Sequence, residues 1–123
     1  MVQVVIYCRT AHDDGISLAM QERELRHFAR EKGWNVKAVY KEHGSGLTLD
    51  RPKLQKAVRA VCTGDSHVLL VRKESCIVRD SWLLQDFVEL LHSHGAVLLS
   101  VSDRLIISSR GWRLVYAGNR KTE

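Results

Sequence analysis

Three arginines stand at or just past the ends of apolar segments, where a folded chain can gather groups that do chemistry. They are Arg9, Arg51 and Arg79. Each guanidinium presents a fixed fork of N–H donors that matches the oxygens of a phosphate. Three converging forks would hold a phosphodiester and stabilise the charge that develops when it is attacked. The alternative is that each arginine is solvated at the surface, the usual environment of this side chain.

Few side chains near these arginines could attack a phosphodiester. Ser45 and Ser75 carry hydroxyls, but the sequence places no evident base beside them, and a bare hydroxyl is a poor nucleophile. Cys76 is better explained as a small side chain that fills space. The six histidines have no spacing typical of metal ligands, and His92 and His94 would not share a helix face. We therefore expect neither a metal ion nor a cofactor.

The elements that must position these groups alternate between strands and helices. Short apolar runs predict buried strands at residues 2–7, 34–40, 67–71 and 97–101. Amphipathic segments between them predict three helices, which end at the evenly spaced Gly33, Gly64 and Gly95. The candidate N-caps are Asp13, Asp14 and Ser17 for the first helix (which runs to about Lys32), Asp50 for the second and Asp80 for the third.

This alternation predicts a three-layer α/β fold with a mostly parallel sheet of four to five strands flanked by helices. We expect one domain over residues 1–123, because this length suits a single core. Ligands of such sheets bind beyond the carboxyl ends of the strands. Those ends are residues 7–12, 41–46, 72–79 and 100–104. The three arginines lie in or near this region, so it is where chemistry is expected.

Apolar spacing also predicts which side chains are buried. The inner face of the third helix is expected to hold Leu83, Leu84, Phe87, Val88, Leu90 and Leu91. Residues 73–79 are expected to form a polar junction, and residues 43–49 a loop. Tryptophans 34, 82 and 112 are expected to be packing anchors rather than platforms for nucleic-acid bases.

Composition narrows the partners and the compartment. The formal net charge of +5 is compatible with a phosphate-rich partner, and equally with a basic protein that binds nothing specific. The three cysteines have no CxxC spacing, and their odd number leaves at least one outside any disulfide. This favours free thiols in a reducing compartment such as the cytoplasm. No apolar run is long enough to predict a signal peptide or a membrane span, so we expect no membrane partner.

The order of motifs resembles the catalytic domain of the serine site-specific recombinases of the resolvase and invertase type. The resemblance extends over about residues 2–116. Each motif is weak alone, but their order and spacing together are specific. The motifs are Tyr7-x-Arg9, Gln21 in the first helix, Glu42-x-x-Ser45-Gly46, Asp50-Arg51-Pro52-x-Leu54, and Arg79 between a strand and the third helix.

The resemblance implies a mechanism and a set of site residues. In this family a serine two residues after the first arginine attacks the DNA phosphodiester and forms a phosphoserine link, while arginines hold the phosphate. Carried over to this chain, Arg9, Arg51 and Arg79 would be phosphate ligands. Gln21 and Ser45 also match family positions and would belong to the same DNA-binding site.

The departures from the family pattern bear on activity. The nucleophile position holds Ala11, and the family's Asp-Arg pair after the third strand is replaced by Ser75 and Cys76. Losing a nucleophile costs on the order of a millionfold in rate, and losing a donor to the developing charge costs roughly a further hundredfold. We therefore expect a pseudoenzyme that has decayed naturally. A relocated nucleophile at Cys76, Ser75 or Thr10 remains the alternative.

The C-terminal segment allows two interpretations. Residues 108–116 resemble the family's approach to a long helix that pairs subunits, and they would equally suit a β-hairpin between residues 105–107 and 113–116. We expect this chain to lack the family's separate DNA-binding domain. The expected partners are DNA, bound weakly, and a recombinase subunit or a second copy. Two other hypotheses stay open: an active strand-transferase fragment, and a protein-interaction domain that does not touch DNA.

Overall fold

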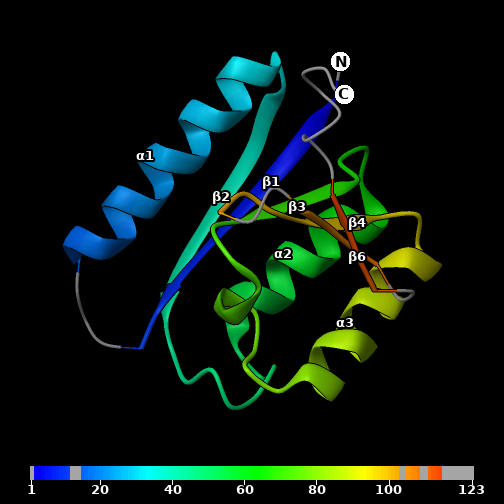
Figure 1. Cartoon of the computed structure of the whole chain (residues 1–123). Coiled ribbons are helices and arrows are strands. Elements are labelled where there is room, and N and C mark those ends of the chain that lie inside the picture. Colours follow the sequence, from blue (N-terminus) through cyan, green and yellow to red (C-terminus); the bar gives the residue numbers. More distant parts are fainter. Residues whose placement is uncertain (1, 12–14, 103–104, 109–110, 115–123) are drawn as a thin grey trace.

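A twisted sheet forms the middle of the molecule (Figure 1). The computed structural model describes residues 2–11, 15–102, 105–108 and 111–114. Within these residues the sheet has six strands in the order β2-β1-β3-β4-β5-β6. Its parallel part consists of β1 (Gln3–Thr10), β2 (Asn35–His43), β3 (Val68–Val71) and β4 (Val97–Ser100). The carboxyl ends of these four strands therefore meet along one edge, as the alternating pattern predicts.

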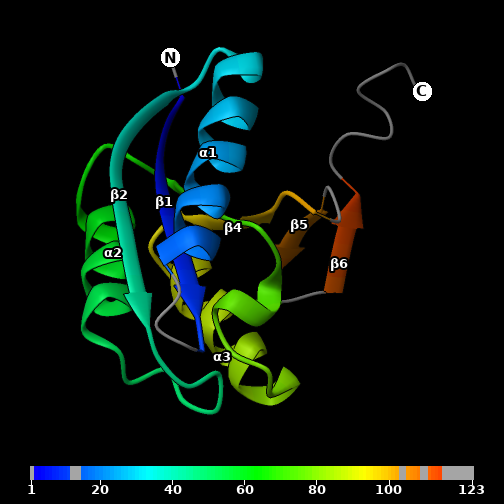
Figure 2. The same ribbon diagram turned by 90° about the vertical axis from the view of Figure 1, so that its left-hand side faces the viewer.

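Helices cover both faces of this sheet. Helix α1 (Gly15–Lys32) lies on one face, and α2 (Pro52–Thr63) and α3 (Ser81–Ser93) lie on the other (Figure 2). Two separate apolar clusters fill the spaces between the layers. The cluster that contains Leu25 lies between α1 and the sheet, and the cluster that contains Leu54 lies between the sheet and the two helices α2 and α3. The predicted three-layer α/β class with a mostly parallel sheet is thus confirmed.

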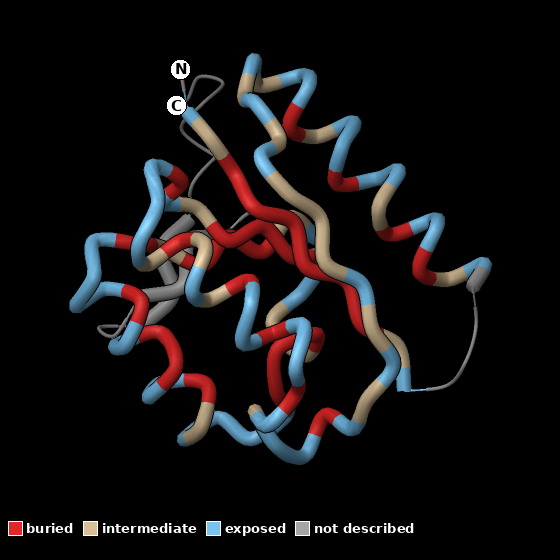
Figure 3. The backbone as a smooth tube through the Cα atoms, turned by 180° about the vertical axis from the view of Figure 1, so that it is seen from behind, coloured by how far each residue is buried: buried red, intermediate tan, exposed pale blue. Residues whose placement is uncertain are grey.

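Strand β1 is buried along most of its length. The centre of the sheet is buried (Figure 3), and all β1 residues from Val4 to Arg9 belong to this buried part. The apolar side chains of β1 alternate between the two clusters. Val5 and Tyr7 face α2 and α3, whereas Val4 and Ile6 face α1. Successive side chains of a strand point to opposite faces. The Arg9 side chain therefore points to the same face of the sheet as the Tyr7 side chain.

The segment after β4 folds back as a hairpin. Strand β5 (Leu105–Ser108) pairs antiparallel with β4, and β6 (Gly111–Leu114) pairs antiparallel with β5. The expected approach to a long helix is therefore wrong for residues 111–114, and the hairpin alternative is confirmed, although β6 begins at Gly111 rather than at the expected residue 113. The hairpin satisfies backbone groups that β4 would otherwise expose at an open edge, and it brings the sheet above the expected four to five strands. Residues 115–123 lie outside the described residues.

The helix ends agree only partly with the predicted caps. The Asp80 side chain accepts hydrogen bonds from the backbone N–H of Trp82 and Leu83, as expected. Helix α2 instead begins after Arg51, so the prediction that Asp50 caps it is wrong. Ser17 lies inside α1 rather than before it, and Asp13 and Asp14 lie outside the described residues.

Both α1 and α3 are followed by a left-handed glycine. Gly33 has a φ of 73° and Gly95 a φ of 78°. Side chains other than glycine rarely adopt this conformation, so these glycines end the helices where the sequence predicted. Gly64 follows α2 with a φ of −100°, so that helix ends without a left-handed residue.

Three predictions of burial are wrong. Leu90 and Trp82 are exposed on α3, because the helix turns its face with Leu84, Phe87, Val88 and Leu91 toward the sheet. The segment 73–79 is not simply a polar junction: it contains a short 3-10 turn, η1 (Glu74–Cys76), and its residues Cys76, Ile77 and Val78 are buried.

Among the described residues, no helix combines the length and apolarity needed to cross a membrane.

Two aspartates near helix starts provide a matched test of capping. We expect Asp80→Ala to lower the free energy of unfolding by about 1 kcal/mol, because two N–H groups of α3 lose their acceptor. Asp50→Ala should change it by less than about 0.5 kcal/mol, because Asp50 is exposed and does not cap α2. Urea denaturation of both variants measures the difference, and an equal loss in both would contradict this assignment.

Candidate functional site

Three segments meet at the carboxyl edge of the parallel strands: the end of β1, the loop between β2 and α2, and the η1 turn. Their contact is direct, since the backbone N–H of Arg79 donates to the carbonyl of Gly46 at 2.9 Å and the N–H of Gly44 donates to the carbonyl of Thr10 at 3.0 Å. A hollow opens over this junction. It is lined by Ala11, His43, Gly44, Ser45, Gly46, Leu47 and Arg79.

Arg9 holds these segments together from beneath. Only 8% of its surface is exposed. Its Nε donates to the carbonyl of Cys76 at 3.0 Å, Nη1 to that of Gly44 at 2.7 Å, and Nη2 to that of Ser75 at 2.7 Å. Three of the five N–H donors of a guanidinium are thus directed at backbone carbonyls of the two loops.

Arg51 is buried more deeply, with 4% of its surface exposed. Its Nη1 donates to the Tyr7 hydroxyl at 2.7 Å and to the carbonyl of Cys76 at 3.1 Å. Its Nε and Nη2 donate to the carbonyl of Thr48 at 3.3 and 3.1 Å. Arg9 and Arg51 therefore share the Cys76 carbonyl. The sequence predicted that all three arginines gather at this edge, and the structure brings these two together in one buried cluster.

Glu42, which the sequence analysis placed in a family motif but gave no role, completes the cluster. The Tyr7 hydroxyl donates to Glu42 Oε1 at 2.6 Å. The backbone N–H groups at the start of α2 donate to the same carboxylate, from Lys53 at 3.1 Å and from Leu54 at 2.9 Å. A carboxylate is favourable at a helix N-terminus because of the exposed N–H groups and the helix dipole. Glu42 thus takes the capping role that the sequence assigned to Asp50.

Gln21 fixes the backbone of Arg9 rather than facing the hollow. Its side-chain Oε1 accepts from the N–H of Arg9 at 3.3 Å, and its Nε2 donates to the carbonyl of Arg9 at 3.1 Å. Cys76 Sγ lies 3.9 Å from the same Oε1. Gln21 is 5% exposed, so a buried amide from α1 positions the end of β1.

Of the expected site residues, Arg79, Ser45 and Ala11 line the hollow itself, and all three are exposed. The Ser45 hydroxyl accepts from the N–H of Leu47 at 3.0 Å, which stabilises the local turn. Ala11 presents a methyl group two residues beyond Arg9. The expected site residues are therefore brought together, but in two groups, with Arg79, Ser45 and Ala11 at the hollow and Arg9, Arg51 and Gln21 below it.

Besides Ala11, two residues depart from the family pattern, and their environments differ. Cys76 is buried in the cluster beneath α2 and α3, in agreement with a space-filling role. Ser75 is half-buried in the η1 turn. What these two residues supply to the arginines is their backbone carbonyls.

Burial sets the protonation of the groups beneath the hollow. It raises the pKa of Tyr7 well above its usual range, and the hydrogen bond to Glu42 raises it further while Arg51 opposes the shift. Tyr7 therefore stays protonated and can donate to Glu42. Burial lowers the pKa of Arg9, and the neighbouring charge of Arg51 lowers it further. Burial likewise raises the pKa of the Cys8 thiol to about 12, which leaves it un-ionised at neutral pH.

One further polar pair lies nearby. The Thr10 hydroxyl is 3.1 Å from His43 Nδ1. The sequence could not place a base beside Thr10, because the two residues come from neighbouring parallel strands and meet through the register of β1 with β2. Among the described residues, no group of three or more histidine, cysteine or acidic side chains could hold a metal ion.

Gly46 provides a test of how tightly Arg9 is held. A methyl group at this position would meet Arg9 Nη2 at 3.0 Å and Arg79 Cγ at 3.3 Å. Because Arg9 is fixed by three hydrogen bonds, we expect Gly46→Ala to lower the free energy of unfolding by about 2 kcal/mol. The neighbouring Ser45→Ala should cost less than about 1 kcal/mol, since it removes one exposed hydrogen bond. Thermal denaturation compares the two, and a Gly46 variant as stable as the parent would show that Arg9 can move.

Known structures with the same fold are recombinase domains. The chain is similar to the N-terminal catalytic domain of TP901-1 integrase, with 24% identity, a TM-score of 0.77, and coverage of 85% of this chain and 81% of that one. It is also similar to a resolvase family site-specific recombinase from Streptococcus pneumoniae, with 21% identity, a TM-score of 0.75, and coverage of 86% and 76%. At these identities the likeness establishes the fold.

A third structure is more similar in sequence. It is the C-terminal catalytic domain of ISC1926 TnpA, an IS607-like serine recombinase, with 28% identity, a TM-score of 0.76, and coverage of 83% of this chain and 71% of that one. No curated protein matches the chain. The family described as "Resolvase, N terminal domain" matches residues 4–116. The chain therefore belongs to the resolvase N-terminal domain family and is a serine-recombinase-like domain of site-specific recombination.

Proposed function

We propose that this domain binds the DNA backbone at the hollow above Arg9 and Arg51, alone or beside a recombinase subunit in the cytoplasm, without cleaving the DNA. The observation that carries the proposal is the position of Ala11. It lines the hollow with Arg79, two residues after the buried Arg9, where a serine would be needed for attack. A methyl group cannot form a bond to phosphorus. The arrangement therefore favours a site that holds phosphate and performs no strand transfer.

The electrostatics of the site support an anionic ligand. Arg51 and Arg79 lie close enough to Arg9 for their charges to lower its pKa. Like charges that are brought together in a partly dehydrated region repel one another, and a bound phosphate would offset that repulsion. Arg79 is exposed and lines the hollow, so its guanidinium is the one best placed to make direct contact.

The geometry argues against a relocated nucleophile. Cys76 is buried, and its sulfur faces the Gln21 amide rather than the hollow. Thr10 has a histidine nitrogen within hydrogen-bonding distance, which is the arrangement that activates a hydroxyl. It is nevertheless not among the residues that line the hollow with Ala11 and Arg79. Thr10 remains the stronger of these two alternatives, because it has a base in contact.

A second candidate function, a protein-interaction domain without DNA contact, is favoured by one observation. The donors of Arg9 and Arg51 are largely committed to carbonyls of the chain itself. These arginines could therefore be retained to hold loops rather than phosphate. The dependence of DNA binding on salt separates the two functions, because contacts with several phosphates release counterions and give a steep slope.

Restoring the family's residues tests whether the site is disarmed. We expect the parent chain to shift labelled duplex DNA at low salt without a denaturant-stable adduct. The triple variant Ala11→Ser, Ser75→Asp, Cys76→Arg should form such an adduct on the same DNA, because it regains the nucleophile and two family side chains. An adduct with the parent chain would overturn the proposal, and Thr10→Ala and Cys76→Ala variants would then identify the attacking atom.

Arg79 tests where DNA is held. We expect Arg79→Ala to weaken duplex binding about three- to tenfold and to reduce the slope of log K against log salt by about 1, because one phosphate contact is lost. Arg59→Ala is the matched control, since Arg59 is an exposed arginine on α2 and does not line the hollow. Equal effects of both substitutions would indicate non-specific attraction to a basic protein, and no salt-dependent binding by the parent would leave the protein-interaction function.

A further inference from the structure

Trp82 is exposed although the sequence predicted that it would pack inside the fold. Its side chain is 78% exposed, and it is the only aromatic one among the large apolar side chains that the described residues expose. Trp34 agrees with the packing prediction, because it is half-buried and its ring meets that of Phe28 edge to face, with the centroids 5.8 Å apart. Covering a large apolar ring is favourable in water, so a partner that covers the Trp82 ring would gain free energy.

The position of Trp82 brings its ring close to the hollow. It lies in the first turn of α3, three residues after Arg79, whose backbone N–H donates to Gly46 in the loop that lines the hollow. Three residues span at most about 11 Å of chain. The Cα–Cβ bonds of a helix tilt toward its N-terminus, so the indole is directed back toward Arg79. Figure 1 shows the start of α3 at the same end of the molecule as the loop between β2 and α2.

Leu47 and Arg79 supply the other parts of a site for a nucleotide. Both line the hollow and both are exposed, Leu47 by 70%. The Arg79 guanidinium suits a phosphate, whereas the leucine and the Trp82 ring offer apolar surface to a base. None of the described residues that line the hollow is acidic. The carboxylate of the adjacent Asp80 is engaged by the N–H groups of Trp82 and Leu83.

An exposed aromatic ring beside a phosphate contact is the combination by which proteins bind single-stranded nucleic acid. In a duplex the faces of each base are covered by the neighbouring base pairs. An indole can therefore stack only on a base that has no pairing partner or that has left the stack, and leaving the stack costs free energy. Every base has a π-face, so stacking of this kind tolerates any sequence. The Trp82 ring thus favours DNA whose bases are unpaired.

We propose that Trp82 stacks on an unpaired base next to the phosphate at Arg79, so that the hollow binds single-stranded DNA more tightly than duplex DNA. The inference rests on the proposed phosphate contact and adds the form of DNA that the site prefers. Asp86 and Glu89 follow Trp82 on the same side of α3, and both are exposed. Their carboxylates repel phosphates, which confines the strand to the hollow and the first turn of α3.

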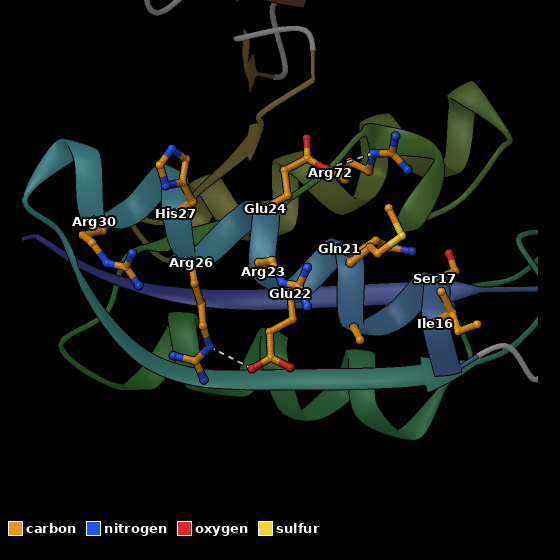
Figure 4. A pocket seen from close by; sticks show the side chains of 12 residues that line it. Ile16, Ser17, Gln21, Glu22, Arg23, Glu24, Arg26, His27, Arg30 and Arg72 are labelled. Atoms are coloured by element: carbon orange, nitrogen blue, oxygen red, sulfur yellow. Dashed lines mark hydrogen bonds and ion pairs between the residues drawn. The ribbon is translucent and has the colours of Figure 1, made fainter.

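The groove along α1 lacks this combination (Figure 4). Arg23, Arg26 and Arg30 line it, but Glu22 and Glu24 line it as well, so its charges are mixed. No phenylalanine, tyrosine or tryptophan is among the described residues that line it. This groove therefore supplies a control for the hollow, because Arg23 is an exposed arginine that has no ring beside it for a base.

Oligonucleotides that differ in their bases test the proposal. Fluorescence anisotropy of the whole chain at low salt compares a short thymidine strand, a duplex of the same length, and an abasic strand that keeps the phosphates without the bases. The parent should bind the thymidine strand about tenfold more tightly than the other two, because one base stacks. Trp82→Ala should weaken binding of the thymidine strand about tenfold and change the other two by less than about twofold. Trp82→Phe should keep most of the preference, because it keeps a ring.

Matched variants separate this inference from the proposed function. Leu90→Ala removes an exposed apolar side chain farther along α3, and Arg23→Ala removes an arginine of the other groove. Both should keep the preference for the thymidine strand, and circular dichroism should show that every variant keeps the fold. Equal binding of the thymidine and abasic strands by the parent, or a Trp82→Ala variant that binds like the parent, overturns the stacking and leaves the phosphate contact standing if Arg79→Ala still weakens binding. Absence of salt-dependent binding to all three DNAs overturns both proposals.

Discussion

Two guanidinium groups are buried beneath the η1 turn, and a buried charge must find hydrogen-bond partners because leaving water is costly. Arg9 and Arg51 find theirs in the carbonyls of Gly44, Thr48, Ser75 and Cys76. These carbonyls belong to the loop between β2 and α2 and to the η1 turn, outside the helices and strands whose backbone hydrogen bonds are regular. The arginines therefore donate hydrogen bonds to the loop carbonyls, and the same carbonyls supply the acceptors that the buried charges need. The shape of the hollow above them follows from this exchange.

The same cluster extends into the fold through Tyr7 and Glu42. Tyr7 stands in the middle of β1, receives a hydrogen bond from Arg51 and gives one to Glu42. Glu42 then accepts from the first N–H groups of α2. The start of α2, the end of β2 and the centre of β1 are thus linked by one chain of charge-assisted hydrogen bonds, which are stronger than neutral ones. The position of the loop between β2 and α2 is fixed from both of its ends.

The sequence predicted the elements well because their signals are local. Apolar runs, helical spacing and glycines at helix ends give the strands, the helices and the fold class, and Asp80 caps α3 from the adjacent position. Contacts between distant residues carried no such signal. Asp50 looked like a cap, but Glu42 from another element does that work. Gln21 was grouped with phosphate ligands, whereas its amide holds the backbone of Arg9. Trp82 and Leu90 fit an apolar helix pattern, and only the rotation of α3 against the sheet leaves them exposed.

These contacts change what the arginines mean under the proposal that the site holds phosphate without cleaving DNA. Ala11 is exposed, so the fold is expected to be nearly indifferent to an alanine or a serine at this position. Arg9 and Arg51 cannot be lost in the same way, because removing either would leave buried carbonyls without donors. Their presence is explained by stability even if the site binds nothing. Arg79 is different: its side chain is exposed at the hollow, and its backbone N–H alone makes the contact with Gly46. The Arg79 side chain is therefore the one that reports on phosphate binding separately from folding.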